Sequence, residues 1–287
     1  MLDPHELRTF EEQGLFIHRQ RLKRARVDQL LDQLPLMRRR TETVAWESDG
    51  TTARALHGGH EQNTEFDRLT RLSALLWPAR QIVRDHVYVY QFKVNLKAAF
   101  AGDCWPWHQD YSFWAKEDGM PEPKAVTVAI FLDDINEFNG PIYFIPGSHR
   151  NGCHDSKDGQ YETADDHNWK RHVGASLSYQ TDPNKVIELA AEHGLLAPKG
   201  PRGTILLFDS NIVHASPSNI SPMHRRLLFI TYNGVHNLPK NTHRPEFLVN
   251  RNVSPLEPME DDDTELSATS SRSQRKPCHP CVSSEHS

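Results

Sequence analysis

The segment 105–111 places the tightest limit on how this protein folds, because His108 and Asp110 stand two residues apart within it. Side chains at that spacing point to the same face of an extended strand, so an imidazole and a carboxylate there can hold one metal ion. A third ligand must come from elsewhere, and His214 is the candidate because it follows the apolar run 205–208. The fold must therefore bring together strands that are far apart in the sequence.

Two histidines and one carboxylate on one side of a metal leave its other positions open, as in the non-haem Fe(II) oxygenases. A His-x-Asp pair alone is a weak signal, and its ordinary interpretation is a surface turn. Three features favour the metal site here. His214 ends an apolar run, and Arg225 stands beside another and is placed to hold an anionic cosubstrate. Aromatic residues that suit a dry pocket surround the pair, namely Trp105, Trp107, Tyr111, Phe113 and Trp114.

Composition excludes several other classes of protein. A length of 287 residues allows one large domain or two small ones, and a net charge of −5 offers no basic face for nucleic acid. No apolar run approaches the roughly 20 residues of a membrane span. The N-terminus has no secretory pattern, and four scattered cysteines make no disulfide framework. We expect a cytoplasmic monomer or homodimer that acts on a small molecule, with neither a membrane nor nucleic acid as partner.

Hydrophobic periodicity predicts helices first and strands afterwards. Helices are expected over residues 4–13, 22–37 and 66–83, the last broken or kinked at Pro78, and another helix begins at Asp182-Pro183. The polar segments 41–63 and 151–180 are expected to be a loop and a surface insertion. Strands are expected over residues 15–17, 87–96, 126–132, 142–145, 203–209 and 227–232.

This order of elements fits a mainly β protein with flanking helices, a double-stranded β-helix of the jelly-roll or cupin-like kind. Such a fold places distant strands side by side, which is how His108 and His214 can meet. We expect a single domain over residues 1–251. Residues 252–287, which include an acidic run and a Ser-rich end, are expected to be a disordered polar tail.

Several fragments, in order, resemble the phytanoyl-CoA dioxygenase family and, within it, the ectoine hydroxylase branch. They are residues 90–91, 95–97, 107–110, 114, 117–121, 136–141, 145–149, 208–209, 214–216, 219–220 and 244–247. The resemblance implies an Fe(II)- and 2-oxoglutarate-dependent oxygenase that uses O2 and is built on a double-stranded β-helix.

The resemblance also implies roles for particular residues. The iron ligands fall on His108, Asp110 and His214, and the 2-oxoglutarate arginine falls on Arg225 rather than on its neighbour Arg226. The other positions that help to seat the cosubstrate fall on Gln91, Asn95 and Ser216. The candidates for substrate contact are Trp114, which matches a pocket tryptophan of the family, together with Thr127 and Phe229.

The sequence departs from the ectoine hydroxylase pattern around the ligands, at positions that include Gln109, Ser112, Phe113, Ala115 and Leu227. We therefore predict hydroxylation of an unactivated C–H bond in a small, amino-acid-like metabolite other than ectoine. Asp110 argues against halogenation, because halogenating relatives have a small residue there. Three alternatives stay open. These are a larger natural-product substrate, a desaturation or epimerisation outcome, and a non-catalytic jelly roll that binds metal.

Overall fold

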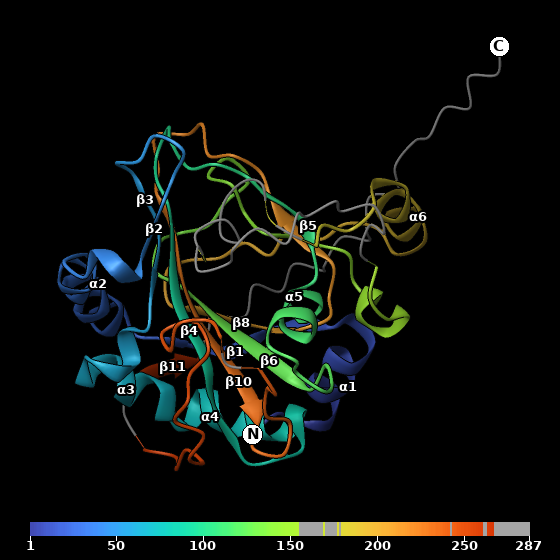
Figure 1. Ribbon diagram of the computed structural model, residues 1–287, viewed down its shortest axis with the longest axis horizontal. Coiled ribbons are helices and arrows are strands. Elements are labelled where there is room, and N and C mark those ends of the chain that lie inside the picture. Colours follow the sequence, from blue (N-terminus) through green and yellow to red (C-terminus); the bar gives the residue numbers. More distant parts are fainter. Residues whose placement is uncertain (155–168, 170–176, 178, 242, 261–262, 267–287) are drawn as a thin grey trace.

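The computed structural model describes residues 1–154, 169, 177, 179–241, 243–260 and 263–266. Within them a large sheet has the strand order β11-β1-β8-β6-β10-β4-β3-β2, and a small sheet has the order β5-β9-β7 (Figure 1). The paired strands are antiparallel in both sheets. The jelly-roll architecture predicted from the sequence is confirmed.

The strands of the large sheet are β1 (Leu15–Leu22), β2 (Val44–Trp46), β3 (Ala53–His57), β4 (Val87–Lys97), β6 (Ala125–Phe131), β8 (Thr204–Asp209), β10 (Arg225–Gly234) and β11 (Thr264–Leu266). Those of the small sheet are β5 (Trp105–His108), β7 (Tyr143–Phe144) and β9 (His214–Ser216). The helices are α1 (Pro4–Gln13), α2 (Arg24–Arg38), α3 (Thr64–Arg71), α4 (Ser73–Val83), α5 (Asp110–Glu117) and α6 (Pro183–His193). Short 3-10 turns are η1 (Thr41–Thr43), η2 (Gly59–Glu61) and η3 (Ser148–Asn151).

The two faces of the large sheet have different partners, and Figure 1 shows α2 and α3 on one side of it and β5, α5 and α6 on the other. On β6, Val128 and Ile130 belong to the core that packs against helices α1 to α4. Ala129 and Phe131, which alternate with them, belong to a second core on the face toward the small sheet. Burial on both faces explains why β6 and β8 are continuous apolar runs rather than alternating ones.

Two helix boundaries agree with the local sequence signals. Asp3 caps α1 by accepting bonds from the backbone of His5 and Glu6, and Gly14 ends the helix with a positive φ of 75°. Asp182 caps α6 in the same way, with Pro183 in the first turn. No helix among the described residues is both long and apolar enough to cross a membrane.

The long helix expected over residues 66–83 is interrupted at a different place from the one predicted. Pro78 lies inside α4, and the break between α3 and α4 falls at Leu72, whose ψ of 125° is extended. Leu72 forms a bridge with Met259, and the backbone N–H of Ser73 donates to the Met259 carbonyl. A contact with a distant segment therefore determines the break, and local helix signals could not reveal it.

The segment 41–63 was predicted to be a loop, and that prediction is wrong. Its central part forms the hairpin of β2 and β3, which extends the large sheet beyond β4. Every residue of β3 is buried, including Arg54 and His57. Arg54 is neutralised by Glu47 at 2.7 Å, and His57 faces an internal cavity. The polar residues of β3 made the segment look like a loop in the sequence, although their partners allow them to be buried.

The predicted boundary of the fold at residue 252 is also wrong. Leu256 is 7% exposed, its N–H donates to the Val87 carbonyl, and Thr264–Leu266 forms strand β11 on the edge of β1. Buried Arg26 pairs with Asp263 at 2.9 Å, so the acidic run is partly neutralised by the fold. Most of the predicted insertion over 151–180 and the end of the sequence over 267–287 lie outside the described residues.

Candidate metal and cosubstrate site

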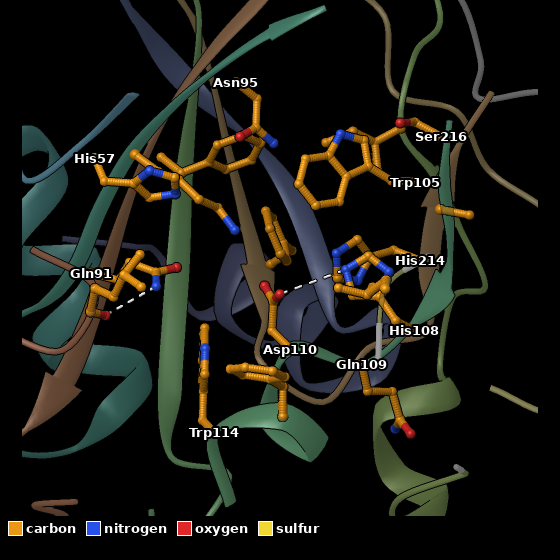
Figure 2. Close-up of a pocket in the computed structure, with 18 of the residues that line it drawn as sticks. His57, Gln91, Asn95, Trp105, His108, Gln109, Asp110, Trp114, His214 and Ser216 are labelled. Atoms are coloured by element: carbon orange, nitrogen blue, oxygen red, sulfur yellow. Dashed lines mark hydrogen bonds and ion pairs between the residues drawn. The ribbon is translucent and has the colours of Figure 1, made fainter. Parts of the chain in front are cut away.

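The three predicted metal ligands meet between the two sheets. His108 ends β5 and His214 begins β9, and the two residues are direct cross-strand partners. Their ring centroids lie 4.2 Å apart, and His108 Nε2 lies 3.7 Å from Asp110 Oδ1. One ligand atom from each of the three residues lies within 4.8 Å of the others. Figure 2 shows both imidazoles and the Asp110 carboxylate converging on one point.

The local geometry differs from the single extended strand that was predicted for His108 and Asp110. The strand ends at His108, Gln109 is extended as the N-cap, and Asp110 is the first residue of α5. The Gln109 side chain is 1% exposed, and its amide donates to the carbonyls of Gly152 and Asn211 at 2.8 and 2.7 Å. Gln109 thus fixes the strand-to-helix turn that brings both ligands to the same side.

Hydrogen bonds to the backbone orient both histidines. His108 Nδ1 lies 2.7 Å from the Pro106 carbonyl, and His214 Nδ1 lies 3.0 Å from the Ile212 carbonyl. A carbonyl can only accept, so in each ring Nδ1 carries the hydrogen and Nε2 carries the lone pair. Such bonds fix the tautomer of metal-binding histidines. Both Nε2 atoms are therefore ready to bind a metal.

The three side chains also have suitable protonation states. Burial lowers the pKa of His108 to about 3, helped by His214, and burial likewise lowers the pKa of His214. Burial alone would raise the pKa of Asp110, but Lys93 and the two imidazoles outweigh it, and that pKa is lowered. Neutral imidazoles and an ionised carboxylate are the forms that bind a divalent metal. The donor set fits Fe(II).

A cavity with about 890 Å³ of empty space, partly open to solvent, adjoins the three ligands. Arg225 lies in its wall and is 1% exposed. Its Nε donates to the Gly140 carbonyl at 2.8 Å, and Nη2 donates to Ser216 Oγ at 3.1 Å. Among the described residues no carboxylate lies in ion-pair distance of it. A buried cation without a counter-ion favours an anionic ligand, which suits the distal carboxylate of 2-oxoglutarate.

The neighbouring Arg226 points the other way. It is half-buried and forms a bidentate ion pair with Asp133. Nε donates to Oδ2 at 2.9 Å, and Nη2 donates to Oδ1 at 2.5 Å. Because consecutive residues of a strand face opposite sides, only one of the two arginines can reach the cavity. The geometry agrees with the choice of Arg225.

The other predicted site residues divide into two groups. Gln91, Asn95, Trp114, Ser216 and Phe229 all line the cavity. Asn95 Oδ1 is buried and has no hydrogen-bond partner in the part of the protein that the structure describes, as expected for a group that awaits a ligand. Thr127 does not line the cavity. Its hydroxyl lies 3.0 Å from that of Thr231 on the adjacent strand, so the prediction that Thr127 contacts substrate is not supported by its position.

Three charged or polar residues of the cavity wall were not predicted: His57, Lys93 and Arg244. Lys93 lies between Gln91 and Asn95 at the period-two spacing of β4, so alternation alone could have identified it. Arg244 lies within a fragment that resembles the family, and its Nε donates to Asp118 at 2.8 Å. His57 was missed because its segment was interpreted as a loop.

A jelly roll with two histidines and one carboxylate beside a cavity, and a buried arginine in that cavity, defines a non-haem iron and 2-oxoglutarate-dependent dioxygenase. The family model for phytanoyl-CoA dioxygenase (PhyH) matches residues 10–227. The protein belongs to the phytanoyl-CoA dioxygenase family.

Two curated relatives indicate the branch of the family. L-proline trans-4-hydroxylase of Streptomyces griseoviridis is 42% identical over 79% of this sequence and 84% of its own length. Ectoine dioxygenase of Halomonas elongata is 34% identical over 86% of this sequence and 76% of its own length. The enzyme is thus similar to hydroxylases of small, amino-acid-like molecules.

Solved structures agree with this assignment. EctD from S. alaskensis with 2-oxoglutarate and 5-hydroxyectoine superposes with a TM-score of 0.76 at 28% identity, over 91% of this protein and 88% of that one. The same enzyme with bound Fe superposes with a TM-score of 0.75. Iron and 2-oxoglutarate are the cofactor and cosubstrate of this class.

Proposed function

We propose that this enzyme hydroxylates free L-proline, or another small α-amino acid with the same groups, at an unactivated carbon–hydrogen bond. The observation that carries the proposal is the 42% identity to L-proline trans-4-hydroxylase over 84% of that enzyme. Each turnover consumes the amino acid, 2-oxoglutarate and O2, and it releases the hydroxylated product, succinate and CO2. The reaction is balanced without another reductant.

Different residues of the site are suited to bind iron, to bind 2-oxoglutarate and to exclude water. His108, Asp110 and His214 would hold iron, which supplies with 2-oxoglutarate and O2 the oxidising power to replace C–H by C–OH. Arg225, Ser216 and Asn95 are suited to hold the cosubstrate. Aromatic and apolar side chains exclude water from the cavity, among them Trp105, Trp114, Phe208 and Phe229.

The cavity wall offers a partner for an amino-acid carboxylate. Lys93 lines the cavity, its Nζ lies 5.3 Å from the centre of the Phe229 ring, and no described carboxylate forms an ion pair with it. A cation on β4, in the wall of the cavity that adjoins the iron ligands, can anchor one end of a substrate while the other end presents a C–H bond. Proline fits this requirement because its C4 lies across the ring from its carboxylate.

Three of the departures from the ectoine hydroxylase pattern lie in the cavity wall, at Gln109, at Phe113 and at Trp105, where that pattern has a phenylalanine. Ser112, Ala115 and Leu227 are outside the wall, so they alter the pocket only through other residues. A site built to bond one set of polar groups rejects a substrate whose groups lie elsewhere. We therefore expect ectoine to be a poor substrate.

The test is succinate release by the purified enzyme with ferrous iron and 2-oxoglutarate. L-proline should stimulate release and yield one hydroxyproline isomer, identified by chromatography against standards. Ectoine, D-proline and pipecolate serve as comparison substrates, and the His108→Ala variant serves as the inactive control. Efficient conversion of ectoine with no conversion of L-proline would overturn the proposal.

A further inference from the structure

His57 is a polar residue of the cavity wall that has no role in binding iron or 2-oxoglutarate in the assignment above. It is the last residue of β3, it is 3% exposed, and its side chain lines the cavity. Figure 2 shows its ring on the side of the cavity opposite His108 and His214. Its position makes it a candidate for contact with substrate.

The tautomer of His57 follows from its one backbone contact. Nδ1 lies 3.1 Å from the Thr43 carbonyl, which can only accept, so Nδ1 carries the hydrogen and Nε2 carries a lone pair. Burial lowers the pKa of this imidazole to about 3, so the ring is neutral at ordinary pH. No hydrogen bond to Nε2 is formed within the described residues. The cavity therefore contains a fixed, uncharged acceptor.

Neighbouring aromatic rings hold the His57 ring in place. Trp169 packs against it edge-on with a centroid distance of 5.3 Å, and Phe247 lies 6.4 Å away. Trp169 and Phe247 also contact each other, at 5.2 Å. A ring held on several sides keeps its acceptor direction, which is the condition for a selective hydrogen bond.

The neighbour of His57 on strand β4 is the cation Lys93. His57 and Lys93 are direct cross-strand partners. Directly opposed residues have Cβ atoms about 4.5–5.5 Å apart. The two side chains therefore start side by side on the same face of the sheet, and both line the cavity. An acceptor and a cation so placed can meet the ammonium group and the carboxylate of one α-amino acid, which are attached to one carbon atom.

We propose that His57 Nε2 accepts a hydrogen bond from the substrate amino nitrogen while Lys93 pairs with its carboxylate. This pair selects α-amino acids over the corresponding carboxylic acids that lack nitrogen. The inference rests on the proposed function, and it names the groups by which the substrate is recognised.

The experiment compares L-proline with cyclopentanecarboxylate, which has the same ring size and carboxylate without the nitrogen. The full-length wild type and two variants, His57→Phe and His57→Gln, are assayed for KM, kcat and coupling of succinate release to hydroxylation. Gln places an amide oxygen near the position of Nε2, so it retains an acceptor. Melting temperature and 2-oxoglutarate affinity report whether each variant is folded.

Losing a hydrogen bond to a charged group corresponds to roughly a 10- to 100-fold loss. His57→Phe should raise the KM for L-proline by at least about tenfold. It should also lower the ratio of kcat/KM for L-proline to kcat/KM for cyclopentanecarboxylate by a similar factor. His57→Gln should restore part of the KM for L-proline and part of the substrate preference. The affinity for 2-oxoglutarate should stay unchanged in both variants. His60→Phe is the matched control, because the His60 imidazole is well shielded nearby but does not line the cavity.

The outcomes separate the two proposals. If the wild type hydroxylates L-proline and His57→Phe keeps the wild-type KM and preference, the role of His57 is wrong and the proposed function stands. If His57→Gln is as impaired as His57→Phe, the acceptor role is also overturned. If the wild type releases succinate with neither L-proline nor any other α-amino acid in a panel, both proposals fail.

Discussion

His108 on β5 and His214 on β9 are direct partners across an antiparallel pair, and each donates its Nδ1 hydrogen to the carbonyl two residues earlier in the sequence. The same arrangement on both strands directs the two Nε2 atoms to one metal position. Loss of either histidine would leave two of the three candidate ligands at that position.

We predict that His108→Ala and His214→Ala will each lose most of the iron, because two remaining ligands hold a divalent ion weakly. Iron per protein molecule, measured by metal analysis after desalting, checks this. His236→Ala is the control, since His236 is exposed and pairs with Asp85 outside the site. Full retention of iron in both ligand variants would show that the metal is bound elsewhere.

The two adjacent arginines should behave differently toward 2-oxoglutarate. Removing one partner of a buried charge pair costs roughly 2–5 kcal/mol, so Arg225→Ala should weaken 2-oxoglutarate binding more than tenfold. Arg226→Ala should leave that affinity unchanged, because Arg226 pairs with Asp133 instead. Titration calorimetry of both variants decides the matter, and the reverse ranking would move the role to Arg226.

Trp114 should affect substrate use more than cosubstrate binding. It lines the cavity from α5, is 3% exposed and packs edge-on against Tyr90 at 5.0 Å. Trp114→Ala should lower substrate-coupled turnover strongly, and Trp114→Phe should restore much of it. The 2-oxoglutarate dissociation constant should change little in either variant. Equal losses in both measurements would mean that Trp114 supports the fold around the whole site.

The segment 253–266 should contribute to stability. A protein that ends at Asn252 lacks the buried Leu256, the Arg26–Asp263 pair and strand β11. Burial of one leucine side chain alone is worth about 1.5–3 kcal/mol, so this protein should melt several degrees lower. A protein that ends at Leu266 should melt like the full-length protein, because the residues beyond it have a polar, Ser-rich composition. Identical melting of all three would contradict the packing described for this segment.

Acidification should destabilise the protein through buried histidines. Burial lowers the pKa of His60 from 6.5 to about 4. Between these values the unfolded state binds more protons than the folded one, so the free energy of unfolding falls as pH falls below 6.5. At pH 5 this loss is about 2 kcal/mol for one such group. Urea unfolding at pH 7.5 and 5.0 should show a smaller loss for His60→Gln than for the wild type.

Asp209 provides a control of opposite sign. Burial raises the pKa of its carboxyl to about 7, so the folded protein binds more protons than the unfolded state between about 3.8 and 7. Asp209 therefore offsets part of the acid loss in the wild type. Asp209→Asn should enlarge the loss in the free energy of unfolding between pH 7.5 and 5.0. A smaller loss than in the wild type would contradict the raised pKa of Asp209.

Sequence reasoning succeeded where local pattern and tertiary role coincide. The apolar runs of β6, β8 and β10 are strands because both of their faces are buried, and the Asp-Pro start of α6 is its observed cap. The three candidate metal ligands could be selected from the sequence because metal chemistry demands particular residue types, and the structure brings these three side chains together. Arg225 was preferred to Arg226 on the family spacing, and alternation along β10 accounts for the opposite directions of the two side chains.

Prediction from the sequence failed where polar residues are buried against partners from other segments. Arg54 and His57 made β3 resemble a loop, although Glu47 and the cavity accommodate them. Met259 and Asp263 belong to a polar stretch that suggested disorder, yet they bind the backbone near Leu72 and the side chain of Arg26. Met259 and Asp263 lie too far from Leu72 and Arg26 in the sequence for any local window to include both partners of a contact.

The pairing of β1 with β8 and β11 has a consequence for how the protein folds. β1 precedes both of its partners in the sequence, and these partners are the distant segments Thr204–Asp209 and Thr264–Leu266. Until β8 has been synthesised, the backbone hydrogen-bonding groups of β1 have neither of these strands beside them. Contacts of such long sequence separation slow folding, since much of the polypeptide must be ordered before they form. We expect the last step of folding to be the closure of this strand between two late-synthesised neighbours, with a rate that depends little on the helices formed earlier.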